Sequence, residues 1–156
     1  MKTLFNKQLL TAPMPRIKLV LPTKIKFTTT IPVRITDINY GNHVGNDSLV
    51  SIIHEARVKW LVTNNYTELN VAGASLIMAD LAVEYKGESF YGDVLTINIF
   101  IGEITTLGFE IFYEIITKRD NHTILIAKAK TGLVCYDYNE RKVTAIPSEF
   151  GSFLSS

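Results

Sequence analysis

Apolar–polar alternation fills the second half of the chain and constrains the fold more than any other feature. Three stretches repeat with a period of two residues, namely Val94 to Ile104, Phe109 to Ile115, and Leu125 to Cys135, and Ser75 to Tyr85 is predicted as the strand before them. Such alternation is typical of strands that bury one face. Every element after Ala72 is therefore predicted to be a strand, and the short turns that separate or follow the later ones predict an antiparallel meander.

One convincing helix precedes these strands, from Asp47 to about Asn64, with Asn46 or Asp47 as a suitable N-cap. Apolar side chains form one face at helical spacing, namely Leu49, Ile52, Ile53, Ala56 and Trp60. Further apolar residues lie off this face, at Val50, Val58, Leu61 and Val62. A helix that is apolar on more than one side is expected where a sheet wraps around it.

A segment rich in Ile, Val and Thr, Lys24 to Thr36, predicts a strand before the helix. Pro32 within it indicates an edge position or a break. The order of strand, helix and four strands predicts an α+β fold, in which a curved antiparallel sheet of about five strands wraps around one long central helix.

Length and composition exclude several classes of protein. The chain has 156 residues, the size of one domain. Its formal net charge of +1 gives no support to a dedicated nucleic-acid binder. No apolar run approaches the ~18 residues that span a membrane. The spacing of His43, His54 and Cys135 fits no zinc site, so no metal and no cofactor is predicted.

The start of the chain lacks the apolar region and cleavage site of a secretory signal. Cys135, the one cysteine, lies in an apolar run and is predicted to be a buried, inert thiol. Together these features predict a reducing, cytoplasmic location.

Charge is distributed unevenly along the chain. Seven basic residues and no acidic residue precede Asp37, and the remainder carries nine basic against fifteen acidic residues. Residues 1–23, punctuated by Pro13, Pro15 and Pro22, are predicted to be an irregular basic extension to a single domain at residues 24–156. The extension is consistent with a solvated tail, a site for an anionic ligand such as a nucleotide phosphate, or a weak membrane-surface arm.

The most informative segment is the polar turn just before the helix. Asp37, Asn39, Asn42, His43 and Asn46 fall within ten residues. A helix N-terminus presents free N–H groups and the positive end of the helix dipole, which can stabilise an oxyanion in acyl transfer.

Glu55 lies two turns into the helix, on a polar stripe from which it could face a cleft. Structural interpretations stay open beside these functional ones. Asp37 and Asn39 are common turn formers, and Glu55 with Lys59 fits a surface ion pair at spacing i,i+4. His43 could be structural, and Tyr85 could belong to the core or to a pocket.

The polar turn resembles a known family. The segment Asp37-Ile-Asn-Tyr-Gly-Asn-His-Val-Gly-Asn46, followed by His54-Glu-Ala-Arg57, is similar to the hotdog-fold acyl-CoA thioesterases of the 4-hydroxybenzoyl-CoA thioesterase type. Their usual pattern is Asp-x-Asp-x-x-Gly-His-Val-x-Asn, then a helix with Glu-x-Ala-Arg. Glu84-Tyr85 with Gly92-Asp93 also matches, and the resemblance covers roughly residues 25–150.

The resemblance implies hydrolysis of the thioester of a fatty or aromatic acyl-CoA by carboxylate-assisted attack of water. The catalytic Asp of many members is Asn39 here, and an amide is not a general base. Glu55 is then the first candidate carboxylate and Asp37 the second, although a pair of His43 with a carboxylate would serve equally.

The resemblance also implies the remaining parts of the site. The backbone N–H near Asn46 would polarise the carbonyl, Asn39 and His43 would position water or the carbonyl, and Val44 and Tyr85 would bind substrate. Homodimers or tetramers with sites at the subunit interface are expected. Basic residues, among them Lys24, Lys26, Lys128 and Lys130, are candidates to meet the CoA phosphates, with a solvated face as the alternative for the last two.

Two other functions stay open. One is an acyl-CoA-binding module without turnover, since Asn39 replaces the usual Asp. The other is a hotdog enoyl-CoA hydratase, whose pattern Asp-x-Asn-Pro-x-His begins like Asp37-x-Asn39. In this chain, however, Tyr40 replaces the Pro, and His43 lies one residue too far along.

Overall fold

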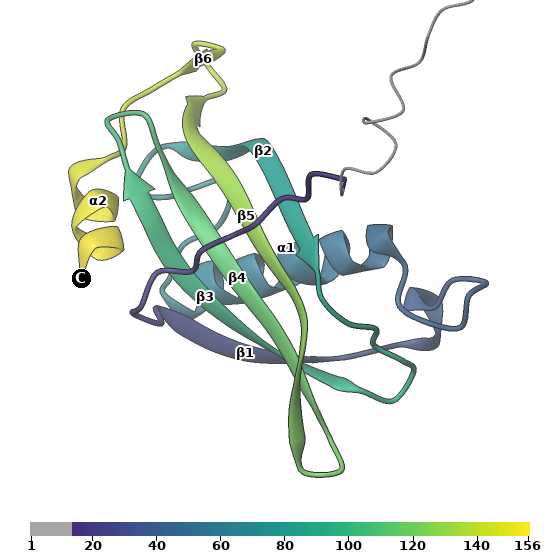
Figure 1. Cartoon of the computed structure of the whole chain (residues 1–156). Helices are drawn as coiled ribbons and strands as arrows, with labels where there is room; N and C mark the ends of the chain where they lie inside the picture. The colour runs from purple at the N-terminus through teal and green to yellow at the C-terminus, as the bar shows by residue number, and fades with distance from the viewer. Residues whose placement is uncertain (1–13) are drawn as a thin grey trace, which may run out of the picture.

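The computed structural model describes residues 14–156, which form one curved antiparallel sheet with a helix across its inner face (Figure 1). The elements in chain order are β1 (Phe27–Pro32), the short 3-10 helix η2 (Ile35–Asp37), α1 (Asn46–Thr63), β2 (Ser75–Tyr85), β3 (Val94–Ile104), β4 (Gly108–Arg119), β5 (His122–Asp137), β6 (Lys142–Val143) and α2 (Ser148–Ser155). The strand order is β1-β3-β4-β5-β2, with β6 paired to β5. The predicted α+β class is confirmed, and β1 and β2 form the two edges of the main sheet.

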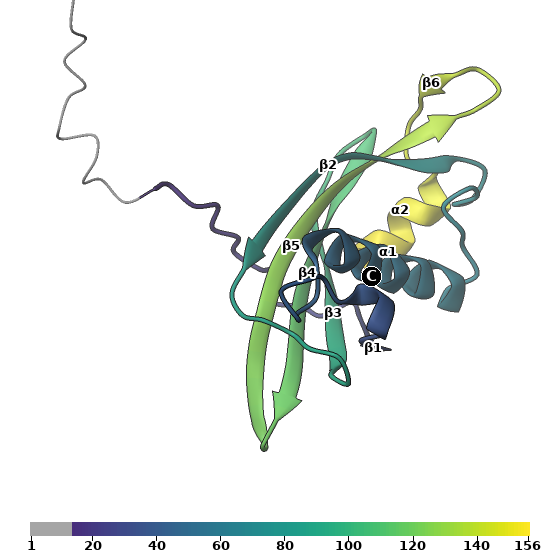
Figure 2. The same ribbon diagram turned by 90° about the vertical axis from the view of Figure 1, so that its right-hand side faces the viewer.

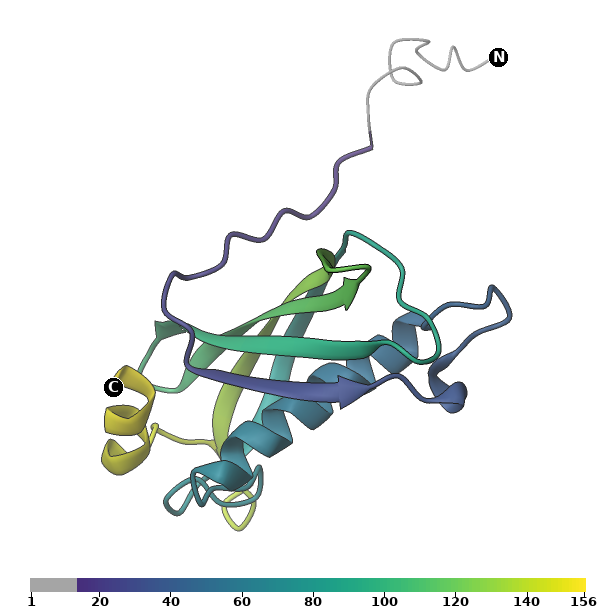
Figure 3. The ribbon, with the colours of Figure 1, turned by 90° about the horizontal axis from the view of Figure 1, so that it is seen from below.

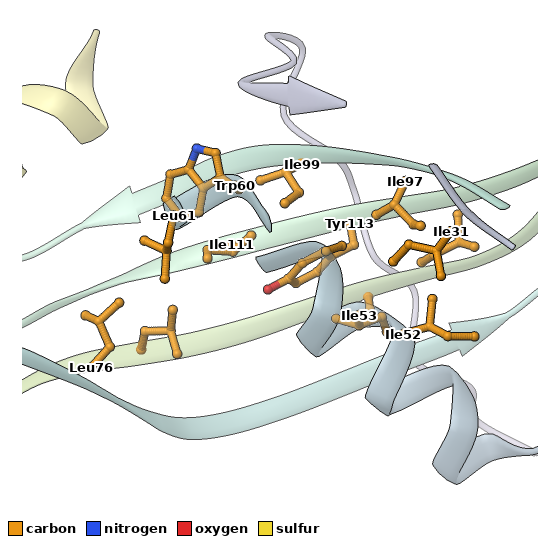
Figure 4. Packing of buried hydrophobic residues seen from close by; sticks show 14 of the residues in the cluster. Ile31, Ile52, Ile53, Trp60, Leu61, Leu76, Ile97, Ile99, Ile111 and Tyr113 are labelled. Atoms are coloured by element: carbon orange, nitrogen blue, oxygen red, sulfur yellow. The ribbon is translucent and has the colours of Figure 1, made fainter. Parts of the chain in front are cut away.

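The helix α1 packs in the hollow of the sheet, as two perpendicular views show (Figures 2 and 3). The core between them is apolar, and its side chains are almost fully buried (Figure 4). It includes Ile52, Ile53, Trp60 and Leu61 from α1 and Ile97, Ile99, Ile111 and Tyr113 from β3 and β4, all at most 1% exposed. Burial of this surface is the main force that holds the helix on the sheet.

The strand predicted at Lys24 to Thr36 is too long. Only Phe27–Pro32 pairs with β3, and Ile35–Asp37 turns as a 3-10 helix. Pro32 ends an edge strand, as predicted, because its missing N–H cannot continue a ladder.

The predicted helix is confirmed to within one residue at each end, but its N-cap is wrong. Gly45 is the N-cap in place of Asn46 or Asp47, and no side chain caps the helix. The Gly45 N–H donates to the Asp37 carbonyl at 3.0 Å.

The expectation that the sheet covers α1 on more than one side holds only in part. Leu61 is fully buried, but Val58 is 37% and Val62 is 57% exposed. These two side chains lie outside the contact of the helix with its own sheet.

The prediction that only strands follow Ala72 is wrong, because α2 closes the chain. Its eight residues include three Ser and one Gly, which form helix less readily than Ala or Leu. Packing stabilises it: Phe153 stacks on Trp60 with ring centroids 5.6 Å apart, and Phe150 meets Tyr66 at 5.0 Å and Phe109 at 5.6 Å. We call these five rings the C-terminal aromatic cluster.

Residues 14–23, here called the basic arm, contain no helix or strand and cross the outer face of the sheet (Figure 1). Two contacts hold the arm. The Leu19 N–H donates to Glu84 Oε2 at 2.9 Å, and Lys128 Nζ donates to the Leu19 carbonyl at 3.3 Å. The rest of the predicted extension, residues 1–13, lies outside the described residues.

Cys135 is fully buried, as predicted, and this burial raises its pKa to about 11, as expected for an unreactive thiol. None of the helices in residues 14–156 has the length and hydropathy of a membrane-spanning segment.

Candidate active site

The polar turn folds into a tight hairpin that leads into α1. Ile38 and Val44 form an antiparallel bridge, and the Asn39 N–H donates to the His43 carbonyl at 2.9 Å. Asn42 sits at the tip with φ of 63°, a conformation that asparagine tolerates. The Asn39 side chain accepts from the Gly41 N–H at 2.8 Å, so its oxygen is engaged in the turn.

Asp37 fastens this hairpin to the start of the helix. Its carboxylate is buried and accepts from the Arg34 backbone N–H at 2.8 Å and from the Arg34 guanidinium at 3.2 and 3.3 Å. Its carbonyl accepts from the Gly45 N–H. These contacts correspond to the turn-forming interpretation of Asp37.

The N-terminus of α1 is open. No side chain caps it, and no described residue accepts a hydrogen bond from the Asn46 N–H. The first N–H groups of a helix lack partners inside the helix and carry the positive end of its dipole. A polarised carbonyl oxygen is a suitable acceptor there.

A cleft of about 320 Å³ opens at this end of the helix. Its walls come from the hairpin and α1, from the β2–β3 connection and from β5. They are His43, Val44, Asn46, Leu49, Tyr85, Gly87, Glu88, Ser89 and Ile126. Four of the seven predicted site residues therefore meet here, namely His43, Val44, Asn46 and Tyr85.

Ser89 contributes to this wall a buried hydroxyl that lacks a partner. The residue is 2% exposed, and its hydroxyl has no hydrogen-bond partner within residues 14–156. Its carbonyl accepts from the Val44 N–H at 2.9 Å, which ties the β2–β3 connection to the hairpin. A buried hydroxyl without a partner is costly, and a ligand that pairs with it would remove that cost.

His43 and Glu88 provide a base and a carboxylate in the same cleft. His43 Nδ1 lies 3.6 Å from Glu88 Oε1, within reach of an ion pair but longer than a hydrogen bond. The side chains are 35% and 65% exposed, so both can meet water and substrate.

Arg119 holds the connection that carries Glu88 and Ser89. Its guanidinium donates to the Asp93 carboxylate at 2.5 and 3.1 Å and to the Glu88 carbonyl at 2.6 Å. It also lies over the Phe90 ring, 4.7 Å from the centroid. The hydrogen bonds from Arg119 lower the pKa of Asp93, so this pair stays ionised through neutral pH.

Glu55 lies apart from the cleft. Its carboxylate pairs with Lys59 Nζ at 3.1 Å and is 38% exposed, and Lys59 also donates to the Thr30 carbonyl of β1 at 3.3 Å. This geometry is that of an exposed i,i+4 ion pair, the structural interpretation of Glu55 that the sequence also allowed.

Glu88 and Ser89 were missed by sequence reasoning, which treated their segment as a connection only. No local pattern distinguishes them, since they reach the site through the pairing of β2 with β5. A second set was also missed: Glu68 accepts from Arg57 Nε at 2.7 Å and lies 2.9 Å from His54 Nε2, beside a groove of about 260 Å³.

Burial raises the pKa of Glu68, but the hydrogen bonds from His54 and Arg57 outweigh it and leave the pKa below its usual value. No three His, Cys, Asp or Glu side chains in residues 14–156 gather as metal ligands would.

Known proteins with the same architecture match this chain along most of its length. The model of the thioesterase-like superfamily matches residues 33–154. A 1,4-dihydroxy-2-naphthoyl-CoA hydrolase of Nostoc punctiforme is 27% identical over 138 residues, which cover 85% of this chain and 88% of that protein.

Solved structures agree on the fold. A 1,4-dihydroxy-2-naphthoyl-CoA thioesterase from Synechocystis has a TM-score of 0.73 at 24% identity, covering 83% of this chain and 96% of that one. A 4-hydroxybenzoyl CoA thioesterase, solved as an Asp-to-Asn variant complexed with 4-hydroxybenzoyl CoA, has a TM-score of 0.72 at 15% identity, covering 82% and 97%. The predicted class, a hotdog-fold thioester hydrolase, is thus confirmed, and the chain belongs to the thioesterase-like superfamily.

Proposed function

We propose that this protein hydrolyses the thioester bond of a fatty or aromatic acyl-CoA in the cleft at the N-terminus of α1. One observation carries the proposal: an uncapped helix end opens into a cleft that also holds His43 and the unpartnered Ser89 hydroxyl. The relatives that act on dihydroxynaphthoyl-CoA and bind 4-hydroxybenzoyl CoA favour an aromatic acyl group.

In this proposal the thioester carbonyl oxygen lies against the N–H of Asn46. Water attacks the carbonyl carbon while His43 accepts its proton, and the N–H groups of the helix stabilise the oxyanion that forms. Collapse breaks the carbon–sulfur bond, and the CoA thiolate leaves and takes up a proton. The products are the free acid and CoA.

Substrate-binding roles follow from position in the cleft. We propose that Val44 and Tyr85 contact the acyl group or the adjoining pantetheine. Burial raises the pKa of Tyr85, so its hydroxyl stays protonated and can donate a hydrogen bond at neutral pH. Asn39 shapes the hairpin that presents His43, and this role is compatible with an amide.

Three carboxylates remain candidates to assist the base. Glu88 lies beside His43 in the cleft, Glu55 pairs with Lys59 outside it, and Asp37 is bound by Arg34. We propose Glu88 as the partner of His43, because it alone of the three lines the cleft. Glu55 and Asp37 remain predictions that the same assay tests.

We further propose that two copies associate through β2. This 11-residue strand is an edge of the sheet, and Met78 on it is 43% exposed. An edge of this length with apolar side chains tends to pair with another strand. A second copy there would complete the sheet and bring further residues toward the cleft.

Release of free thiol from a panel of aliphatic and aromatic acyl-CoA substrates tests the activity. We expect turnover that falls about 100-fold or more in His43→Ala and in Glu88→Gln, as for loss of a general base. A loss of turnover in Glu55→Gln, with full turnover in Glu88→Gln, would instead assign the role of the assisting carboxylate to Glu55. Tight binding of acyl-CoA without thiol release by the unmodified protein would contradict hydrolysis and favour a binding module.

A further inference from the structure

A second cavity lies on the outer side of the molecule, between the basic arm and the end of β2. It measures about 480 Å³ and is lined by Met14 to Lys18 from the arm and by Val83 to Lys86 from β2. The residues that line the cavity from the arm come before residue 33, where the family match begins. The cavity therefore depends on a segment outside the matched residues.

The charge of this cavity is positive. Arg16 and Lys18 line it from the arm, and neither pairs with an acidic side chain in the described part of the chain. Lys86 lines it from β2. Glu84, its one acidic residue, is already engaged by Lys86 at 2.5 Å and by the Leu19 N–H at 2.9 Å.

Apolar side chains lie beside these cations. Met14 is 77% and Ile17 is 56% exposed on the same arm. Exposed apolar surface next to unpaired cations matches a ligand that combines phosphates with a flat organic ring, as a nucleotide does.

Tyr85 connects this cavity with the active-site cleft, because it lines both. The cleft itself has no Lys or Arg in its wall, and its charged residues are His43 and Glu88. Phosphate groups attached to a thioester bound there would need cations outside the cleft, and the arm supplies them on the far side of Tyr85.

Three of the four lysines suggested from the sequence are engaged elsewhere, whereas Lys128 donates to the Leu19 carbonyl of the arm itself. Lys26 Nζ donates to the Phe153 carbonyl at 2.5 Å and lies 4.6 Å from the centre of the Phe153 ring, and Lys24 donates to the Ser156 carbonyl. Both therefore hold α2 at the opposite end of α1. Lys130 pairs with Glu110 at 2.9 Å and Asp80 at 3.4 Å.

We propose that the basic arm and β2 form the subsite for the phosphates of the CoA nucleotide, with Arg16, Lys18 and Lys86 as their charge partners. This inference rests on the proposed function. It assigns the basic arm, the described part of the extension, to a nucleotide-phosphate site rather than to a tail or a membrane-surface arm.

The test compares an acyl-CoA with the same acyl group on pantetheine, which lacks the nucleotide. The variant is Arg16→Gln/Lys18→Gln. The matched control is Arg141→Gln/Lys142→Gln, which removes the same two charges from an exposed site around β6. Thermal unfolding followed by circular dichroism checks that both variants fold.

We expect the arm variant to raise KM for acyl-CoA about tenfold while kcat changes less than twofold. KM for acyl-pantetheine should stay the same, and the control should behave as the unmodified protein. Unchanged KM for acyl-CoA, or an equal rise for both substrates, would overturn the subsite. Loss of binding to anionic phospholipid vesicles with unchanged KM would overturn it in favour of a membrane-surface arm.

A direct binding measurement separates this inference from the proposed function. If neither thioester is hydrolysed, calorimetric titration with CoA itself still tests the arm. Weaker CoA binding by the arm variant than by the control would retain the subsite without catalysis, and equal binding would overturn it.

Discussion

The two ends of α1 are built in contrasting ways. At the C-terminal end, α2 covers the helix, Phe150 is fully buried, and Asn64 Nδ2 donates to the Trp60 carbonyl at 2.7 Å. At the N-terminal end, Gly45 provides no side-chain cap and a cleft of about 320 Å³ stays open. One end is closed by apolar packing and the other leaves polar groups accessible.

The C-terminal end of α1 therefore contributes stability, whereas the N-terminal end presents the groups proposed for catalysis. Apolar burial in the C-terminal aromatic cluster fixes the position of α1 against the sheet. The exposed N-terminal turn can then keep free N–H groups and a buried hydroxyl without a partner, both of which oppose folding but serve binding. Changes at the two ends should therefore affect different measurements.

The largest expected effect is on stability, at the closed end. Phe150→Ala removes a ring that contacts Tyr66, Phe109 and Phe153. We expect a loss of about 3–5 kcal/mol in the free energy of unfolding, from lost burial and the cavity left behind. Urea unfolding measures the loss. A large rise in KM of the folded variant, with little loss of stability, would break the separation of the two ends.

An intermediate effect is expected in acid, at the open end. The pKa of Asp93 is lowered in the folded protein by Arg119, so this pair stabilises the fold above the unfolded pKa and its contribution is lost as pH falls through the lower folded pKa. Asp93→Asn should cost about 1.5 kcal/mol at pH 7. The difference from the unmodified protein should shrink below about pH 3.8, the ordinary pKa. Equal cost at pH 7 and pH 3 in urea unfolding would contradict the ion pair.

A smaller effect is expected at the unpartnered hydroxyl. Ser89→Ala should leave stability unchanged or raise it by up to about 1 kcal/mol, since it removes a buried group without a partner, while it lowers turnover. Ser75→Ala is the matched control, because Ser75 Oγ donates to the Leu69 carbonyl at 2.8 Å, and its loss should destabilise without changing turnover. The reverse pattern would show that Ser89 is structural.

The smallest effect is expected at Glu55. If its contact with Lys59 is an exposed ion pair only, Lys59→Ala and Glu55→Gln should each cost about 0.3–0.5 kcal/mol of stability. Turnover should stay within twofold in both. A large loss of turnover in Glu55→Gln alone would move the chemistry away from the open end of α1.

The fold was predictable because its signals are local. Period-two alternation marks β3, β4 and β5, and the helical spacing of Leu49, Ile53 and Trp60 marks α1. The helix α2 was not predictable, since Ser and Gly disfavour helix. Contacts with distant residues stabilise it, namely the packing of Phe150 and Phe153 and the hydrogen bonds from Lys24 and Lys26 to carbonyls at its C-terminal end.

The site was predictable in the part that lies in one segment and, through the family resemblance, at Tyr85. His43, Val44 and Asn46 are neighbours in sequence, whereas Glu88 and Ser89 reach them through the sheet. Glu55 was favoured because Asn39 replaces the family's catalytic Asp, although its spacing to Lys59 already indicated the surface ion pair that the structure contains. The roles of these residues in catalysis stay predictions.

The most direct test of the open helix end changes its backbone. Asn46→Pro removes the N–H proposed to bind the oxyanion. Proline is favoured at the first helical position, and Gly45, with φ of −68° and ψ of 156°, has the conformation that precedes proline. Asn46→Ala keeps the N–H and is the control.

Thiol release from an acyl-CoA should fall about 100- to 1,000-fold in Asn46→Pro, as for loss of one oxyanion donor, with stability changed by less than about 1 kcal/mol. Asn46→Ala should keep turnover within a few-fold. Equal turnover in the two variants, with both folded, would contradict a thioester site at the N-terminus of α1.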